Sequence, residues 1–195
     1  QVEEDQNIRY PEGQDAETCL VQGQAVIRVF HEHTDPEEQV LAVSEAMAVP
    51  LINSRGEILA DPLIGELDLL VRDREGRKVI VDWKTAARRW PRGKADKEIQ
   101  PTAMLYAYRQ QHGETPGFRY DIGLKTKTPG FQQESTERGQ DDFDRMVWLI
   151  QRIERAVQAE AFLPQPGFLC PSCPYQQACR GWHRHASRTT VPVAA

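Results

Sequence analysis

Two apolar runs separated by a short polar turn place the strongest constraint on the fold. "LIGELDLLVRD" (63–73) is followed by "REGR", which contains Gly76, and then by "KVIVDWKT" (78–85), the most apolar run of the chain. Apolar runs of this length around a turn predict two strands joined as a β-hairpin. A hairpin with this turn brings Asp68 and Asp82 roughly opposite each other on adjacent strands.

The remaining chain predicts helices and strands around this hairpin. Its patterns predict helices over 19–33, 96–113 and 141–162, and further strands over 39–52 and 118–127. This order predicts an α/β fold in which a central mixed β-sheet is flanked by helices. We expect an irregular lead-in over 1–18, one domain over 19–182 and a flexible tail over 183–195.

The charge distribution permits a local nucleic-acid contact on an otherwise acidic chain. The net charge of −5 argues against a protein that coats nucleic acid non-specifically. Directly after the hairpin, however, Arg88, Arg89 and Arg92 form a basic run in which the only nearby acid is Asp96. This run is either a solvated surface or a groove that contacts DNA.

No segment of the sequence predicts a membrane or secretory location. No apolar run approaches the ~18 residues that a membrane-spanning helix needs. The first apolar segment is also too short for a secretory signal. We therefore expect a cytoplasmic protein without a membrane partner.

The hairpin carries residues suited to metal-dependent hydrolysis. Two facing carboxylates, Asp68 and Asp82, repel each other unless a cation shares the site. Mg²⁺ and Mn²⁺ prefer such oxygen ligands. Lys84 lies two residues beyond Asp82 and so points to the same face, where it could orient water or stabilise charge on a phosphate. The alternative is an edge strand that emerges into water, with Asp82 and Lys84 forming a surface pair.

The two hairpin strands also resemble a known family. "IGELDLL" followed by "VIVDWKT" resembles the GxxD and D-x-K-T signatures of the PD-(D/E)XK nucleases, in their RecB-like branch. This resemblance implies a restriction-endonuclease-like core in which Asp68 and Asp82 bind Mg²⁺ or Mn²⁺. It further implies that the main-chain carbonyl of Trp83 is a metal ligand and that Lys84 is the catalytic lysine.

Two more residues are assigned through the same resemblance. Family members often complete the metal site with a histidine from an earlier helix, and His31 matches this position better than His33. A family motif of Gln followed four residues later by Tyr is half present, because Met104 stands four residues after Gln100. The resemblance implies that Gln100 contacts DNA or positions water.

The four cysteines predict a metal centre. Cys170, Cys173 and Cys179 lie in "CPSCPYQQAC", and Cys19 stands alone near the start. In a cytosolic protein such a cluster favours metal over disulfides, and both zinc and iron–sulfur clusters accept thiolates. The one-plus-three distribution resembles the iron–sulfur members of the RecB-like nucleases: the CRISPR-associated RecB-like exonuclease, the AddB subunit and the nuclease domain of a eukaryotic replication helicase. That resemblance implies a [4Fe–4S] cluster.

The resemblance implies a metal-dependent DNA exonuclease, closest to the CRISPR-associated family. Its substrate would be DNA that is single-stranded or has exposed ends. Its role would be CRISPR spacer acquisition, with an integrase or another protein as partner, or phage or repair processing of DNA. The alternative function is a catalytically weak DNA-end-binding module that serves a partner nuclease or integrase.

Overall fold

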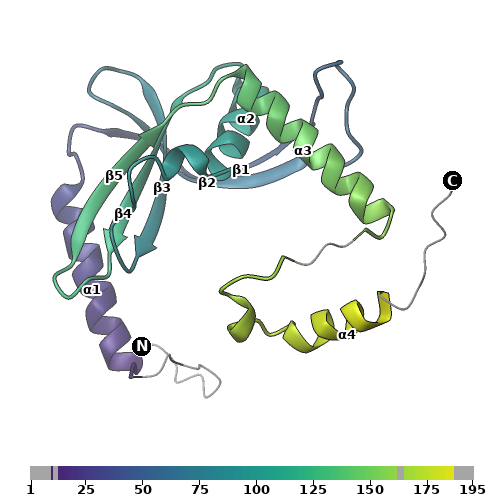
Figure 1. Cartoon of the computed structure of the whole chain (residues 1–195). Coiled ribbons are helices and arrows are strands. Elements are labelled where there is room, and N and C mark those ends of the chain that lie inside the picture. The colour runs from purple at the N-terminus through teal and green to yellow at the C-terminus, as the bar shows by residue number, and fades with distance from the viewer. Residues whose placement is uncertain (1–9, 11–12, 162–164, 187–195) are drawn as a thin grey trace, which may run out of the picture. The chain divides into compact units, whose positions relative to one another are not determined.

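A mixed β-sheet with a helix layer on each face forms the centre of the molecule (Figure 1). The computed structural model describes residues 10, 13–161 and 165–186. Five strands lie side by side in chain order, and only β3 and β4 are parallel. The strands are β1 (Gln39–Val49), β2 (Leu63–Arg72), β3 (Lys78–Ala86), β4 (Gly117–Leu124) and β5 (Gly130–Thr136). The predicted α/β fold with a central mixed sheet is confirmed.

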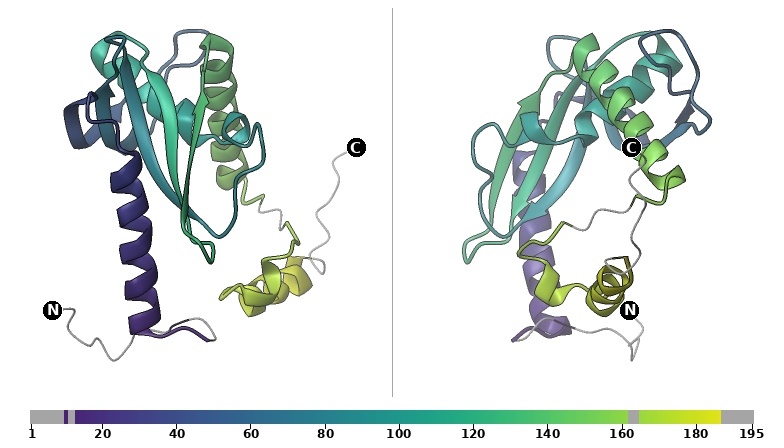
Figure 2. Two further views of the ribbon diagram at one scale, coloured as in Figure 1. Left: turned by 90° about the vertical axis from the view of Figure 1, so that its left-hand side faces the viewer. Right: turned by 45° about the vertical axis from the view of Figure 1, so that its right-hand side comes forward.

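The described chain divides into two compact units, one up to Gln151 and one from Arg152. The first unit holds the sheet, with α1 on one face and α2 and the start of α3 on the other (Figure 2). The second unit contains a short 3₁₀ helix and α4. The α-helices are α1 (Ala16–His33), α2 (Gln100–His112), α3 (Gln140–Gln158) and α4 (Gln176–Ala186); the 3₁₀ helices are η1 (Ala95–Lys97) and η2 (Cys170–Ser172).

Several element boundaries differ from the predictions. Helix α1 begins at Ala16 because the Asp15 side chain caps it, accepting a hydrogen bond from the Thr18 N–H at 2.8 Å. Strand β5 was missed because two of its buried residues, Gln132 and Thr136, are polar and conceal the apolar pattern. Helix α2 starts at Gln100, after η1, and not at residue 96.

The C-terminal predictions also need correction. Helix α3 ends at Gln158, shortly before Glu160 takes a positive φ of 52°, whereas the prediction extended it to 162. Residue 162 lies outside the described residues. Residues 183–186, predicted as the start of a flexible tail, belong to α4, and the rest of that predicted tail (187–195) lies outside the described residues.

The main core lies between the sheet and the layer formed by α2 and α3. Tyr106 and Tyr108 of α2 and Phe143 of α3 are buried there against the strands. The hydroxyl of Tyr106 donates to the Pro50 carbonyl at 3.0 Å and accepts from the Ile52 N–H at 2.9 Å. Burial of these rings supplies hydrophobic stabilisation while the hydroxyl remains hydrogen-bonded.

Helix α1 packs closely on the opposite face because β4 has a glycine where the helix crosses it. A Cβ built on Gly123 would lie 2.5 Å from side-chain atoms of both Val26 and Phe30. Only a glycine therefore permits this distance between helix and sheet. Among the described residues, no helix combines the length and apolar character that a membrane crossing requires.

Candidate active site at the end of the hairpin

The β2–β3 hairpin opens at the two aspartates. Its pairing runs from Arg72–Lys78 to Leu69–Val81, and the next step of this register places Asp68 opposite Asp82. There the ladder ends, and the Asp68 carboxylate accepts a hydrogen bond from the Trp83 backbone N–H at 2.9 Å. Strand β3 continues beside β4, where Asp82 pairs with Tyr120. The carboxylates therefore meet at a fork between β2 and β3.

An irregularity in the neighbouring strands β1 and β2 accompanies this fork. Leu67 and Leu70 both join the core, although strict alternation would place residues three apart on opposite faces. Asp68 lies between them, across from Ser44 of β1, which has a positive φ of 51°. The break in alternation thus coincides with Asp68. At this residue the backbone pairing of β2 with β3 has ended, and the Asp68 side chain bonds to the β3 backbone in its place.

Asp82 is buried and incompletely bonded. Asp82 is only 4% exposed, and its Oδ1 accepts a hydrogen bond from Gln100 Nε2 at 2.5 Å. Lys84 Nζ lies 2.6 Å from Oδ2 as an ion pair, and this ammonium is the close polar neighbour of that oxygen among the described residues. Among the described residues, Asp82 Oδ2 is the buried side-chain oxygen that has no hydrogen-bond donor.

The electrostatics of Asp82 reflect this setting. Burial raises the pKa of the Asp82 carboxyl above its usual range. Lys84 and Gln100 act against this rise, whereas the negative charge of Asp68 adds to it. The ionised form of Asp82 therefore lacks part of the positive charge that it needs. A divalent cation bound near Asp82 Oδ2 would provide that charge.

The lysine is held over an aromatic ring that the sequence analysis missed. Lys84 Nζ lies 5.8 Å from the centroid of the Tyr120 ring, and the lysine side chain is 34% exposed. Tyr120 is almost fully buried, and burial together with the charges of Asp82 and Glu98 raises the pKa of its hydroxyl. Tyr120 lies in the run "FRYDIGL", which the sequence predicts as a strand. The register of this strand against β3, which pairs Tyr120 with Asp82, is visible only in the structure.

His31 and Trp83 lie differently from this cluster. His31 is an exposed residue of α1, a helix that packs on β4 and β5. Within the described part of the chain, no three His, Cys, Asp or Glu side chains gather closely enough to hold a metal ion, so His31 does not join Asp68 and Asp82 in such a group. The Trp83 side chain is half exposed and lines a cavity beside α1.

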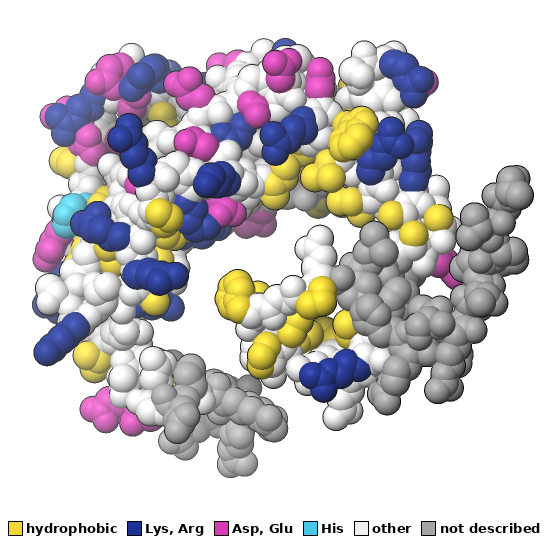
Figure 3. Space-filling view, in the orientation of Figure 1, with side chains coloured by type: hydrophobic (Ala, Val, Ile, Leu, Met, Phe, Trp, Pro, Cys, Tyr) yellow, Lys and Arg dark blue, Asp and Glu magenta, His cyan; other side chains and the backbone are white. Residues whose placement is uncertain are grey.

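The basic run after β3 is free to contact a ligand. Arg88, Arg89 and Arg92 are exposed in the loop between β3 and η1. Among the described residues, no hydrogen bond or ion pair holds their side chains. Lys94, by contrast, pairs with Glu98 and lies 4.3 Å from the Trp90 ring centroid. Figure 3 shows basic and acidic side chains interspersed over the sheet unit on the face in view. The arginines are therefore of interest because they follow Lys84 directly in the chain, and not because they form a patch of one charge.

The four cysteines are free thiols. Cys19 lies in α1, where its Sγ donates to Gln14 Oε1 at 3.6 Å. The others belong to the second unit, in which Cys170 Sγ accepts a hydrogen bond from the Gly167 N–H at 3.2 Å. Cys173 and Cys179 are exposed. Thiols suit iron or zinc chemically, but Cys170, Cys173 and Cys179 do not form a metal-holding group by themselves in the described structure.

Comparison with known proteins decides the family. The family model of the PD-(D/E)XK nuclease superfamily matches residues 3–180, which is most of the chain. The chain belongs to the PD-(D/E)XK nuclease superfamily. In this nuclease-superfamily chain, Asp82, Trp83 and Lys84 supply the D-x-K sequence for which the superfamily is named.

Solved structures agree with this PD-(D/E)XK fold. The crystal structure of SSO0001 matches with a TM-score of 0.51 and 12% identity over 85% of this chain and 72% of the other. A candidate exonuclease from Eubacterium rectale matches with a TM-score of 0.51 and 14% identity over 95% of this chain and 67% of the other. At such identities the likeness establishes the fold alone. No curated protein matches the sequence significantly.

Proposed function

We propose that this PD-(D/E)XK nuclease-superfamily member is a metal-dependent DNA exonuclease that reacts at Asp68, Asp82 and Lys84. One observation carries the proposal. The buried Oδ2 of Asp82 has the Lys84 ammonium beside it and no well-aligned hydrogen bond among the described residues, while the charge of a second carboxylate, Asp68, acts on the same group. A buried carboxylate oxygen that has one ammonium beside it and a second carboxylate nearby is suited to bind a further cation.

The residues present fit Mg²⁺ or Mn²⁺. Asp82 and Asp68 would hold the ion through carboxylate oxygens, with the Trp83 carbonyl proposed as a further ligand; His31, predicted as a ligand from the sequence, lies outside this group. When bound, such an ion acts as a Lewis acid on phosphoryl oxygens and lowers the pKa of a coordinated water. Gln100 fixes the Asp82 carboxylate through its 2.5 Å hydrogen bond.

Lys84 and the basic loop would act on the DNA itself. Lys84 is partly exposed, so its ammonium can stabilise the negative charge that develops on a phosphate during hydrolysis. Arg88, Arg89 and Arg92 are unpaired within the described chain and can neutralise phosphates of the bound strand. The Eubacterium rectale protein is described as a candidate exonuclease, which favours action from an end.

We also propose that the protein belongs to the RecB-like iron–sulfur branch. The spacing of Cys19, Cys170, Cys173 and Cys179 supports a [4Fe–4S] cluster, which would have a structural role. The same proposal includes the role of the protein, which would be CRISPR spacer acquisition with an integrase or else phage or repair processing of DNA. It also includes a cytoplasmic location. Anaerobic purification should yield a brown protein that loses iron in Cys19→Ser. A colourless protein with one bound zinc would refute the cluster and leave the nuclease site unaffected.

Digestion of end-labelled DNA tests the activity. Linear single- and double-stranded DNA should be degraded in Mg²⁺ or Mn²⁺ and spared in EDTA, while a covalently closed single-stranded circle should survive. Cutting of the circle would show an endonuclease. DNA binding without cleavage in either metal would favour the alternative, a catalytically weak module that binds DNA ends for a partner enzyme.

A further inference from the structure

A cavity of about 370 Å³ lies on the other side of strand β3, between α1 and the sheet. Its size is within the range of small-molecule sites, roughly 300–1,000 Å³. Part of its wall is aromatic: Trp83 contributes an indole that is half exposed, and Phe30 and Phe131 contact each other with ring centroids 5.2 Å apart. The cavity therefore offers apolar and π-electron surface to a ligand.

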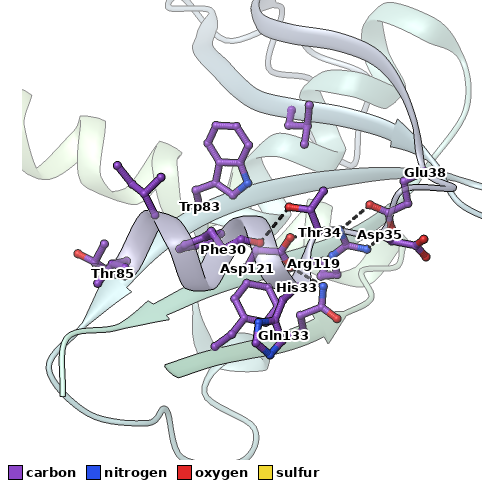
Figure 4. Close-up of a pocket in the computed structure, with 14 residues that line it drawn as sticks. Phe30, His33, Thr34, Asp35, Glu38, Trp83, Thr85, Arg119, Asp121 and Gln133 are labelled. Atoms are coloured by element: carbon purple, nitrogen blue, oxygen red, sulfur yellow. Dashed lines mark hydrogen bonds and ion pairs between the residues drawn. The ribbon is translucent and has the colours of Figure 1, made fainter. Parts of the chain in front are cut away.

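The charged part of the wall contains one guanidinium between two carboxylates (Figure 4). Arg119 donates to both oxygens of Glu38, at 2.6 and 3.0 Å, and to both oxygens of Asp121, at 2.9 and 3.2 Å. Gln133 Nε2 also donates to Asp121 Oδ1 at 2.9 Å. The three charged side chains are 11–15% exposed. One negative charge is thus in excess within a largely buried group.

The other ionisable residues of the wall do not remove this excess. Asp35 is already neutralised by Arg74, whose two nitrogens bond its two oxygens at 2.7 Å. His33 stacks on Phe131 and bonds through Nδ1 to the Val29 carbonyl at 2.8 Å. Burial raises the pKa of Asp121 against the opposing effect of Arg119, and the charge of Glu38 adds to this rise.

These features distinguish between classes of ligand. Excess negative charge disfavours a phosphate or another anion, and so disfavours the DNA backbone. Arg119 already bonds to all four oxygens of Glu38 and Asp121, so a metal ion would have to compete with the guanidinium for the short contacts that it requires. An organic cation has no such requirement, because it is stabilised by nearby negative charge and by aromatic faces.

We propose that this cavity binds an organic monocation, an ammonium or guanidinium group carried on an apolar stem. The cationic group lies near Glu38 and Asp121, and the stem lies along Trp83, Phe30 and Phe131. The ligand is either a free amine or a basic side chain of another protein; the two share this chemistry. The proposal does not depend on nuclease activity, because it uses side chains on the face of β3 opposite Asp82 and Lys84; of Trp83 it uses the indole and not the backbone.

Calorimetric titration of the wild-type protein with three probes of similar shape tests the charge preference. Benzylamine should bind saturably, benzyl alcohol at least about tenfold more weakly and benzoate not at all, as a charge-assisted contact predicts. Equal binding of benzylamine and benzyl alcohol, preferred binding of benzoate, or no saturable benzylamine binding would each overturn the proposal. This series requires no variant and so does not depend on whether a mutant folds.

Matched variants then locate the site. Glu38→Gln removes the excess charge and should lower benzylamine affinity to that of benzyl alcohol, whereas the exposed Glu57→Gln should leave it unchanged. Phe131→Leu should weaken both probes. An affinity unaffected by Glu38→Gln and Phe131→Leu would overturn the assignment to this cavity.

N-acetylargininamide distinguishes the two sources of the cationic group. Tighter binding than benzylamine assigns a partner's basic side chain as the ligand, and weaker binding assigns a free amine.

Discussion

The two faces of the sheet around β3 contain the same imbalance of charge, two carboxylates for one basic side chain, but resolve it differently. Beside α1, Glu38 and Asp121 share Arg119, and all four carboxylate oxygens accept hydrogen bonds. At the fork, Asp68 and Asp82 have Lys84, and Asp82 Oδ2 has no donor within the described structure. The comparison teaches that a carboxylate oxygen without a well-aligned hydrogen bond, more than the number of carboxylates, identifies the candidate metal site.

The largest expected effect separates Asp82 from Asp121, two buried carboxylates on neighbouring strands. Asp82→Asn should reduce DNA cleavage by at least about 10³-fold, because it removes a metal ligand and its charge. Asp121→Asn should retain cleavage, since its side chain is on the other face. Rates measured on end-labelled DNA in Mn²⁺ check this prediction, and equal losses in the two variants would remove the distinction between the faces.

A folding control accompanies this first prediction. Because burial raises the pKa of Asp82, its ionised form costs the folded protein stability once the pH exceeds that raised pKa, and this cost is absent at lower pH where the carboxyl is protonated. The neutral Asp82→Asn side chain should therefore not lower the melting temperature of the metal-free protein at pH 7. A large decrease would attribute any lost activity to unfolding.

The second effect concerns two lysines on the same face of β3. Lys84→Ala should lower the cleavage rate by about 10²–10³-fold if its ammonium stabilises charge in the transition state. Lys78→Ala is the matched control, because Lys78 lies at the other end of the strand and pairs with Glu114. Single-turnover rates at saturating Mn²⁺ measure this difference, and a Lys84→Ala rate near that of wild type would contradict the assigned role.

The third effect tests the α1 face through its helix contact. Gly123→Ala places a methyl group 2.5 Å from Val26 and Phe30 and should destabilise the fold by about 1–3 kcal/mol, as overpacking does. Gly130→Ala, where the nearest atom is 3.5 Å away, is the milder control. Urea unfolding measures both free energies. Equal stabilities would mean that α1 does not pack against Gly123 in solution.

The smallest effect concerns the basic loop beside the fork. Charge reversal of Arg88, Arg89 and Arg92 should weaken DNA binding and flatten its logarithmic salt dependence by up to roughly 3, about 1 per lost phosphate contact. Fluorescence anisotropy at several salt concentrations, with metal-free protein, supplies the slope. An unchanged slope would return these arginines to the solvated-surface interpretation.

The sequence predicted much of one face and little of the other, for a physical reason. Asp68, Asp82 and Lys84 lie on one hairpin, so strand alternation and a local turn suffice to place them together. The Glu38–Arg119–Asp121 group joins residues up to 83 positions apart and depends on the pairing of β4 with β3, which local patterns do not specify. Buried polar residues in β5 likewise concealed that strand.

Binding of Mn²⁺ to Asp82→Asn and Asp121→Asn, measured by calorimetry beside wild type, tests the central claim most directly. The account predicts that wild type and Asp121→Asn bind Mn²⁺ with similar affinity, whereas Asp82→Asn loses at least about tenfold, or 1.4 kcal/mol. Wild-type Mn²⁺ affinity in Asp82→Asn, with both proteins folded, would contradict the assignment of the Asp82 carboxylate as a metal ligand.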